Sequence, residues 1–258
     1  MLFVLLASVL CVVTAYTLRA NVIDHGSITV SGLNGIGVIF GFIFYVLASS
    51  VFGAEIAVTL IASLLLHEMG QVLAYRMLGH SQAKFRLVML QYNQPISAQP
   101  LTNDGEEFFT AIMGAVFSLG PMVLSLAIAA ALLPVAPVTA HQFWLFGVTC
   151  GALNFVSLLP FWPFAGGRCI RTSVVKFWPG LGPMMTVFLS AAMLVASLRT
   201  GSVALMVLAG IGAQSLWRPS PSGLEPMEPE TGLIALSAYA FTLAAHFSAG
   251  WLLFLVYI

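Results

Sequence analysis

The chain has 258 residues, of which 60% are hydrophobic and only 7% are charged, whereas an ordinary soluble domain carries about 25% charged residues. This composition, with a mean hydropathy of +1.00, excludes a soluble globular domain and indicates a polytopic protein of the lipid bilayer. The net charge is zero, and no basic run points to a nucleic-acid partner. The three cysteines are scattered through apolar segments without a CxxC pair, so neither disulfides nor thiolate metal sites are expected.

Apolar runs of spanning or near-spanning length predict six to eight transmembrane helices. In chain order the runs cover residues 1–18, 35–52, 54–78, 108–133, 142–160, 181–198, 202–217 and 232–257. We therefore expect an all-α membrane protein, organised as N-terminal membrane helices (1–53), a central unit (54–180) and C-terminal membrane helices (181–258).

The stretch over residues 84–99 follows the third run and does not have a helical pattern. Lys84, Arg86, the β-branched residues and Pro95 favour short strands at the cytoplasmic interface. We expect a small β-hairpin there, with an ordinary interfacial loop as the alternative. The edge of a hairpin could hold an extended peptide by strand addition, and Tyr92 and Asn93 are the candidate substrate-binding residues.

The distribution of basic residues predicts how the chain is oriented in the membrane. If the run 54–78 ends in the cytoplasm, eight of the nine Lys and Arg residues lie inside and only Arg199 lies outside, as the positive-inside rule requires. The same alternation brings the ends of the runs 54–78 and 142–160 to one membrane face. We expect an integral protein of a bacterial inner membrane in which these two polar-bearing helices meet.

An ionisable pair, His67 and Glu68, lies near the middle of the run 54–78. Ionisable residues at membrane depth are costly and usually face a cavity or a partner with a function. The stretch His67-Glu68-Met69-Gly70-Gln71 is one residue short of H-E-x-x-H, in which two histidines bind zinc and the glutamate is the general base. The alternative is a histidine and a carboxylate that only satisfy each other within a helix bundle.

The other histidines are His25, His80, His141 and His246, and none has a ligand partner at helical spacing. Each is expected to be hydrogen-bonded rather than bound to a metal. His246 is the one most expected to have a role, because it lies within the run 232–257, where a polar side chain is costly.

Small and acidic residues mark the run 108–133 and its start. Gly114, Ala115, Ser118 and Gly120 allow close packing of helices. The acidic residues of the segment 104–107 suit the positive end of a helix dipole, so we expect them to cap this helix.

A second unusual segment covers residues 154–168, NFVSLLPFWPFAGGR. It breaks a membrane helix with two prolines and two glycines directly after the polar Asn154. Broken backbone at membrane depth is tolerated only where it is buried in protein or lines a wet cavity. This segment therefore indicates a second part of a functional site.

Together the two segments resemble the site-2 protease family of intramembrane zinc metalloproteases, over roughly residues 54–176. That family has H-E-x-x-H in one helix, then a further helix, then a helix with an asparagine, prolines and a Leu-Asp-Gly motif. The resemblance implies that His67 is the first zinc ligand, Glu68 the catalytic glutamate, and Asn154 a residue near the substrate carbonyl or its oxyanion. It also implies that Gln71 and Ala165 stand at the other two ligand positions.

These two substitutions bear directly on zinc. A catalytic zinc site needs about three protein ligands drawn from His, Cys, Asp or Glu, whereas Gln71 offers a neutral amide and Ala165 offers no donor. We therefore expect an intramembrane protease scaffold with weak or lost zinc binding and impaired peptide-bond hydrolysis. By the resemblance, its partner is a membrane-spanning protein substrate or partner helix. The alternatives are an active zinc endopeptidase with substitute ligands, and a transporter or channel that uses His67 and Glu68.

Overall fold

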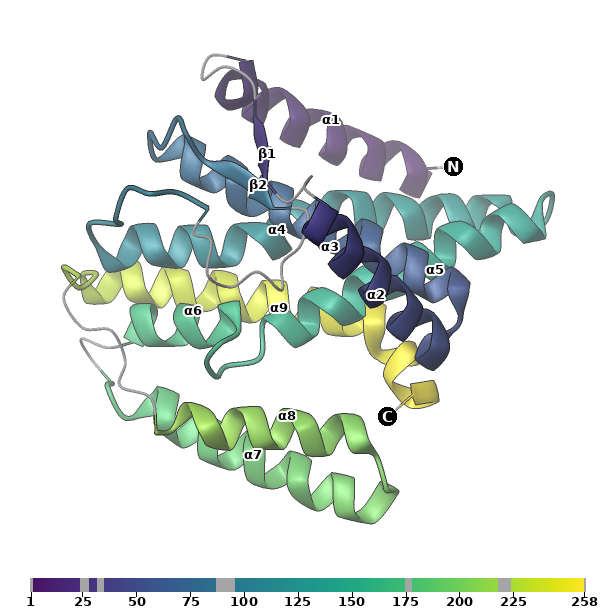
Figure 1. Cartoon of the computed structure of the whole chain (residues 1–258). Helices are drawn as coiled ribbons and strands as arrows, with labels where there is room; N and C mark the ends of the chain where they lie inside the picture. Colours follow the sequence, from purple (N-terminus) through teal and green to yellow (C-terminus); the bar gives the residue numbers. More distant parts are fainter. Residues whose placement is uncertain are drawn as a thin grey trace.

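The computed structural model describes residues 2–23, 28–31, 35–86, 96–174, 178–217 and 224–257. These residues form nine helices and two short strands (Figure 1). The helices are α1 (Leu2–Ile23), α2 (Gly35–Phe52), α3 (Ala54–Met77), α4 (Asp104–Leu132), α5 (Pro137–Ser157), α6 (Ala165–Val174), α7 (Leu181–Thr200), α8 (Val203–Ser215) and α9 (Pro229–Tyr257). The strands are β1 (Thr29–Ser31) and β2 (Lys84–Arg86).

Five of the described helices are long and apolar enough to cross a membrane, namely α1, α3, α4, α7 and α9. The apolar parts of α2 and α8 are shorter. All eight apolar runs of the sequence form helices, so the chain is an all-α protein with membrane-spanning helices. The number of spans, six to eight, stays a prediction.

Helix α6 lies in the polar stretch between the fifth and sixth apolar runs, where hydropathy predicts no helix. It has only 10 residues and buries one face, with Cys169, Ile170 and Val174 in a cluster shared with α4 and α9. A short amphipathic helix of this kind is stabilised by the elements that cover its apolar face. Its presence is therefore set by tertiary packing rather than by a long apolar run.

The two strands pair in parallel, with Val30 opposite Phe85 and Ser31 opposite Arg86. The partner of β2 is thus a strand that precedes α2. The backbone N–H of Lys84 also donates to the carbonyl of Ile96 at 2.8 Å, so the two ends of the segment 84–96 lie side by side. Residues 87–95, including Tyr92 and Asn93, lie outside the described residues, and the hairpin stays a prediction.

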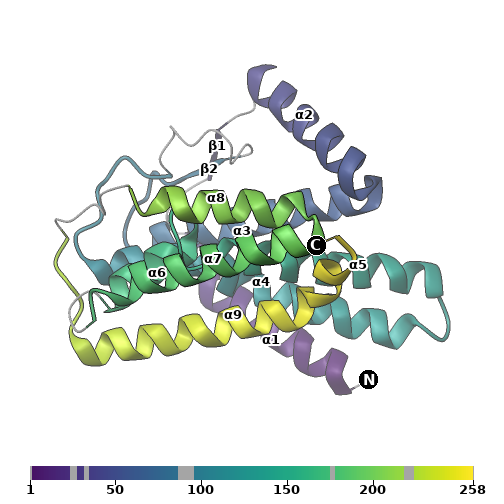
Figure 2. The same cartoon turned by 90° about the horizontal axis from the view of Figure 1, so that it is seen from below.

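Helix α4 lies at the centre of the bundle and packs against α3, α5, α6 and α9. Helices α7 and α8 run side by side (Figure 1 and Figure 2), and Figure 1 shows them along one side of this bundle. The closest approach of α3 and α4 depends on glycine: a Cβ atom at Gly70 would lie 2.5 Å from the backbone oxygen of Met113, and one at Gly114 would meet the ring of His67. This packing agrees with the role expected of Gly114 from its size.

We predict that Gly70→Ala lowers the free energy of unfolding by about 1–3 kcal/mol, because the added methyl group would push α4 away from α3. Thermal unfolding of the purified protein in detergent measures this. Gly210→Ala in α8 is the matched control, since a Cβ atom there meets nothing within 4 Å. Equal unfolding temperatures for the two variants would contradict the close contact between α3 and α4.

Candidate functional site

The centre of the site is a hydrogen bond between α3 and α5. His67 Nδ1 lies 2.7 Å from Asn154 Oδ1, across 87 positions of the sequence. Both side chains are buried, with exposed fractions of 3% and 0%. The structure thus brings together the two segments that the sequence singles out.

The partners of Asn154 determine where the proton of His67 lies. Asn154 Nδ2 donates to the carbonyl of Cys150 at 2.9 Å, which leaves its Oδ1 atom facing the imidazole. An amide oxygen only accepts hydrogen bonds, so Nδ1 of His67 carries the proton and Nε2 has a lone pair. A ring N–H held by an oxygen, with the other nitrogen free of a proton, is the arrangement that orients histidines as metal ligands.

Gln71 takes the position next to that lone pair. Its Nε2 atom lies 3.3 Å from Nε2 of His67, one helical turn away on the same face of α3. An amide N–H group donates, so Gln71 caps the nitrogen that a metal ion would need. The imidazole also faces α4 at Gly114, where a Cβ atom would lie 2.5 Å from the same Nε2 atom.

Ala165, the third ligand position of the resemblance, is the first residue of α6. It is 6% exposed and belongs to a buried cluster with Ala111 and Ala115 of α4. The donor set therefore consists of one imidazole, one amide that donates to it and one methyl group, which does not fit zinc. Across the described residues, no three His, Cys, Asp or Glu side chains gather where they could hold a metal ion.

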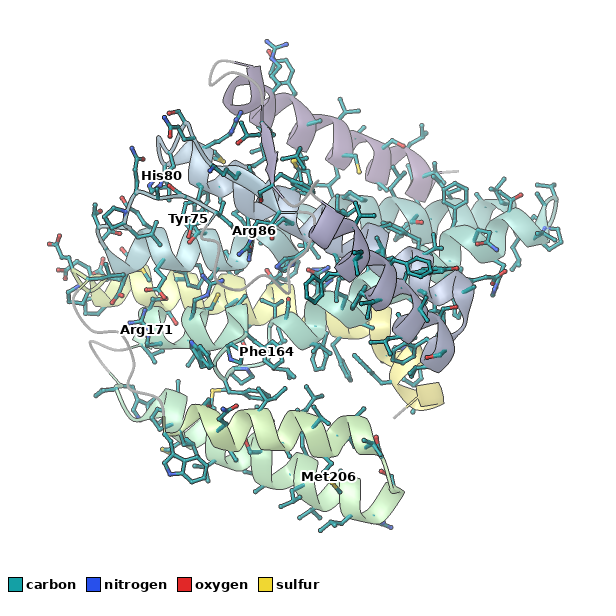
Figure 3. The ribbon with its side chains drawn as sticks, viewed as in Figure 1. Tyr75, His80, Arg86, Phe164, Arg171 and Met206 are labelled. Carbon is teal, nitrogen blue, oxygen red and sulfur yellow. The ribbon has the colours of Figure 1, made fainter. Side chains whose placement is uncertain are left out.

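Glu68 forms a bidentate ion pair with Arg86 of β2. Its carboxylate accepts from Nε at 2.6 Å and from Nη2 at 3.0 Å. The side chain of Glu68 is 0% exposed and that of Arg86 is 17% exposed, and Figure 3 shows Arg86 beside α3. The sequence gives no sign of this partner beyond a basic residue in a stretch of strand propensity.

His246 of α9 is a second buried histidine at the same depth. The hydroxyl of Tyr239 donates to the carbonyl of Leu158 at 2.6 Å, and the rings of Phe247 and Phe155 lie 5.1 Å apart. These contacts align α9 with the end of α5 and place His246 level with Asn154.

The ring of His246 is 0% exposed. Its Nε2 atom lies 3.0 Å from the carbonyl of Ala115, so Nε2–H donates and Nδ1 has a lone pair. That Nδ1 atom has no hydrogen-bond partner among the described residues. His67 and His246 therefore contact neighbouring residues, Gly114 and Ala115, of a single turn of α4.

The break after α5 has the form that its prolines and glycines predict. Helix α5 ends at Ser157 and α6 begins at Ala165, with Phe164 in the turn between them (Figure 3). A Cβ atom at Gly166 would lie 1.9 Å from the carbonyl oxygen of Leu158, and one at Gly167 would lie 2.5 Å from the backbone of Phe161. The start of α6 is therefore folded directly onto the end of α5, which only glycine allows.

Charged residues at the start of α4 also fix α6. Asn103 caps α4, because its Oδ1 atom accepts from the backbone N–H of Glu106 at 2.9 Å. Glu107 instead forms an ion pair with Arg171 of α6, and Asp104 lies 3.7 Å from the same guanidinium. The acidic segment thus joins two helices, beyond the capping role expected of it.

A scan against protein-family models, a search of curated proteins and a search of solved structures each found no match for this chain.

We predict that Arg86→Met lowers the free energy of unfolding by about 3 kcal/mol or more, because it leaves the buried carboxylate of Glu68 without its charge partner. Adding Glu68→Gln should recover most of this loss, since the buried charge is then removed. Equilibrium unfolding in detergent measures both changes.

Lys84→Met is the control for the Arg86 variant, because it removes an exposed basic residue from the same strand. It should change stability by less than about 0.5 kcal/mol. An Arg86 variant as stable as the Lys84 variant would contradict the ion pair with Glu68.

Proposed function

We propose that this protein is a site-2-protease-like membrane scaffold that binds membrane-spanning protein segments and no longer holds the zinc ion that hydrolysis needs. The observation that carries the proposal is the hydrogen bond from His67 Nδ1 to Asn154 Oδ1. It joins the incomplete H-E-x-x-H segment to the broken-helix segment. Those are the two parts that the resemblance to the protease family requires at one site.

The hydrogen bonds of the His67 imidazole support the relation to the protease family in this proposal. Its Nδ1–H is held by a side-chain oxygen and its Nε2 atom has a lone pair within the bundle, as in histidines that bind metals. Any neutral histidine divides its nitrogens in this way, so the support comes from where the lone pair lies: Nε2 of His67 is beside residue 71 of the incomplete H-E-x-x-H segment. The broken segment after α5 is buried at residues 158–161, and burial in protein is one of the two settings in which irregular backbone is tolerated at membrane depth.

The neighbours of His67 support the loss of hydrolysis. The amide of Gln71 donates to the nitrogen that a metal ion would need, and Ala165 supplies no donor. Without a metal ion there is no Lewis acid to make a nucleophile from water at neutral pH. Glu68, the base of the family, is held by two hydrogen bonds from Arg86, so its carboxylate is already engaged.

The position of β2 supports the binding part of the proposal. Arg86 fixes this short extended segment to α3 through its ion pair with Glu68. Glu68 is the residue that follows His67, so β2 lies close to the candidate site. Since β2 is itself paired with β1 and bonded to Ile96, a peptide held by strand addition would add to the outer edge of β1. The partner would be a membrane-spanning protein segment, with the end of α3 on the cytoplasmic side of a bacterial inner membrane.

One observation favours the rival function, an active zinc endopeptidase with substitute ligands. His246 has a buried Nδ1 atom with no hydrogen-bond partner among the described residues. Its Nε2 atom contacts Ala115, which is next to the Gly114 that faces the ring of His67. It is the imidazole that a substitute site would use. The metal content of the purified protein separates the two functions.

We predict that the protein purifies with well under one zinc ion per chain, because one histidine does not hold zinc against water. Elemental analysis after mild dialysis measures this. Stoichiometric zinc that is lost in His246→Ala would overturn the proposal and establish the substitute site.

We further predict that zinc binding is restored by Gln71→His together with Ala165→Asp, which supply an imidazole one turn from His67 and a carboxylate at the ligand position that the resemblance assigns to residue 165. Each substitution alone should restore little, because two ligands leave the ion weakly held. The double variant in proteoliposomes should gain cleavage of single-span membrane proteins. Glu68→Gln in that background should keep the zinc and lose the cleavage, as removal of a general base does.

A double variant that folds and binds no more zinc than either single variant would contradict the assignment of the ligand positions. The control is Ala204→Asp with Gln214→His, which places the same side chains ten residues apart at exposed positions of α8 and should bind no zinc.

A further inference from the structure

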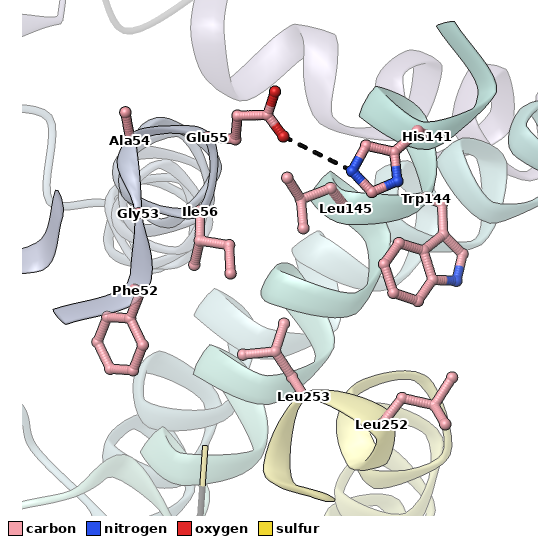
Figure 4. A pocket seen from close by; sticks show the side chains of 10 residues that line it. All are labelled: Phe52, Gly53, Ala54, Glu55, Ile56, His141, Trp144, Leu145, Leu252 and Leu253. Carbon is pink, nitrogen blue, oxygen red and sulfur yellow. Dashed lines mark ion pairs between the residues drawn. The ribbon is translucent and has the colours of Figure 1, made fainter. Parts of the chain in front are cut away.

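A cavity of about 390 Å³ lies at the end of the bundle where α2 ends, α3 and α5 begin and α9 ends (Figure 4). Glu55, at its edge, precedes His67 by twelve residues of α3, which is about 18 Å along a helix. The cavity is therefore separate from the candidate site. Because it lies at the ends of apolar helices, it opens at the level of a membrane surface.

The wall of the cavity is apolar and its edge is polar. Ligand pockets of about 300–1,000 Å³ usually combine an apolar wall with a few polar groups, and this cavity falls within that range. Its apolar side chains, shown in Figure 4, are Phe52, Ile56, Leu145, Leu252 and Leu253. Gly53 lies between α2 and α3 with φ of +89°, a conformation that glycine adopts without strain.

The polar edge is formed by Glu55, His141 and Trp144. The carboxylate of Glu55 lies 3.6 Å from Nε2 of His141 and accepts from Nε2 of Gln142 at 3.3 Å. The rings of His141 and Trp144 stack with their centroids 5.8 Å apart. Both contacts of Glu55 are long and its side chain is 61% exposed, so the carboxylate has acceptor capacity left for a ligand.

We propose that this cavity binds a phospholipid whose headgroup carries a primary ammonium group, such as phosphatidylethanolamine. The ammonium would donate to the carboxylate of Glu55, a charge-assisted hydrogen bond, beside the indole ring of Trp144, which attracts cations. An acyl chain would cover the leucines and Phe52, where burial of apolar surface stabilises it.

The charge of the lining distinguishes this headgroup from an anionic one. Among the described residues that line the cavity, none is a lysine or an arginine, so a headgroup with a net negative charge would meet the carboxylate of Glu55 without a counter-charge. Tryptophan is also enriched at the membrane–water interface, where its ring lies at the level of the headgroups. The inference does not depend on the proposed function, because the two sites share no residue.

The test uses the full chain in nanodiscs that contain phosphatidylethanolamine and phosphatidylglycerol with identical acyl chains in equal amounts. Native mass spectrometry of the released protein gives the ratio of the two lipids retained. We expect phosphatidylethanolamine to be retained in excess. Glu55→Gln should lower the ratio about two- to fivefold, the effect of one exposed ion pair.

Two further variants complete the test. Glu230→Gln removes an exposed carboxylate at the other end of α9 and should leave the ratio unchanged. Leu252→Trp fills the cavity and should reduce retention of phosphatidylethanolamine without altering any charge. Equal retention of the two lipids by the unmodified protein, an excess of phosphatidylglycerol, or equal ratios for the Glu55 and Glu230 variants would each overturn the proposal.

Discussion

The hydrogen bond between His67 and Asn154 is the interaction on which the interior of this protein depends. Both groups are buried in an apolar bundle where water does not replace a lost partner, and a polar group left alone there costs free energy. The bond fixes the rotation of α3 relative to α5. Gln71 lies beside the same imidazole because it is one turn further along α3, and the backbone of α4 fits against the ring only because residue 114 is glycine.

Polar groups along α3 are satisfied by different elements, and this arrangement holds the bundle together without an ion. His67 is paired with α5, Glu68 with β2, and Gln71 with His67 within its own helix. A zinc site would instead draw these groups toward one centre. In the proposed zinc-free state, the side chains of α3 that would face the metal ion are already engaged in these hydrogen bonds. Regaining the metal would require new ligands and the release of the present partners.

Hydropathy and motif spacing predicted most of this architecture, because a helix that crosses a membrane is apolar along its whole length. The pairing of His67 with Asn154 and the break before Ala165 could also be anticipated, since polar and broken segments at membrane depth need partners. The contacts of Arg86 and His246 could not. A basic residue in a short strand and a histidine in a long helix give no sign of which carboxylate or carbonyl will lie opposite, because tertiary packing decides this.

The central claim is that His67 keeps the orientation of a metal ligand while the amide of Gln71 occupies its ligand nitrogen. Solid-state ¹⁵N NMR of histidine-labelled protein in lipid bilayers tests this claim most directly, with the His67 signals assigned by their loss in His67→Asn. The account predicts a proton on Nδ1 and a bare, hydrogen-bonded Nε2. A proton on Nε2, with Nδ1 bare, would contradict it.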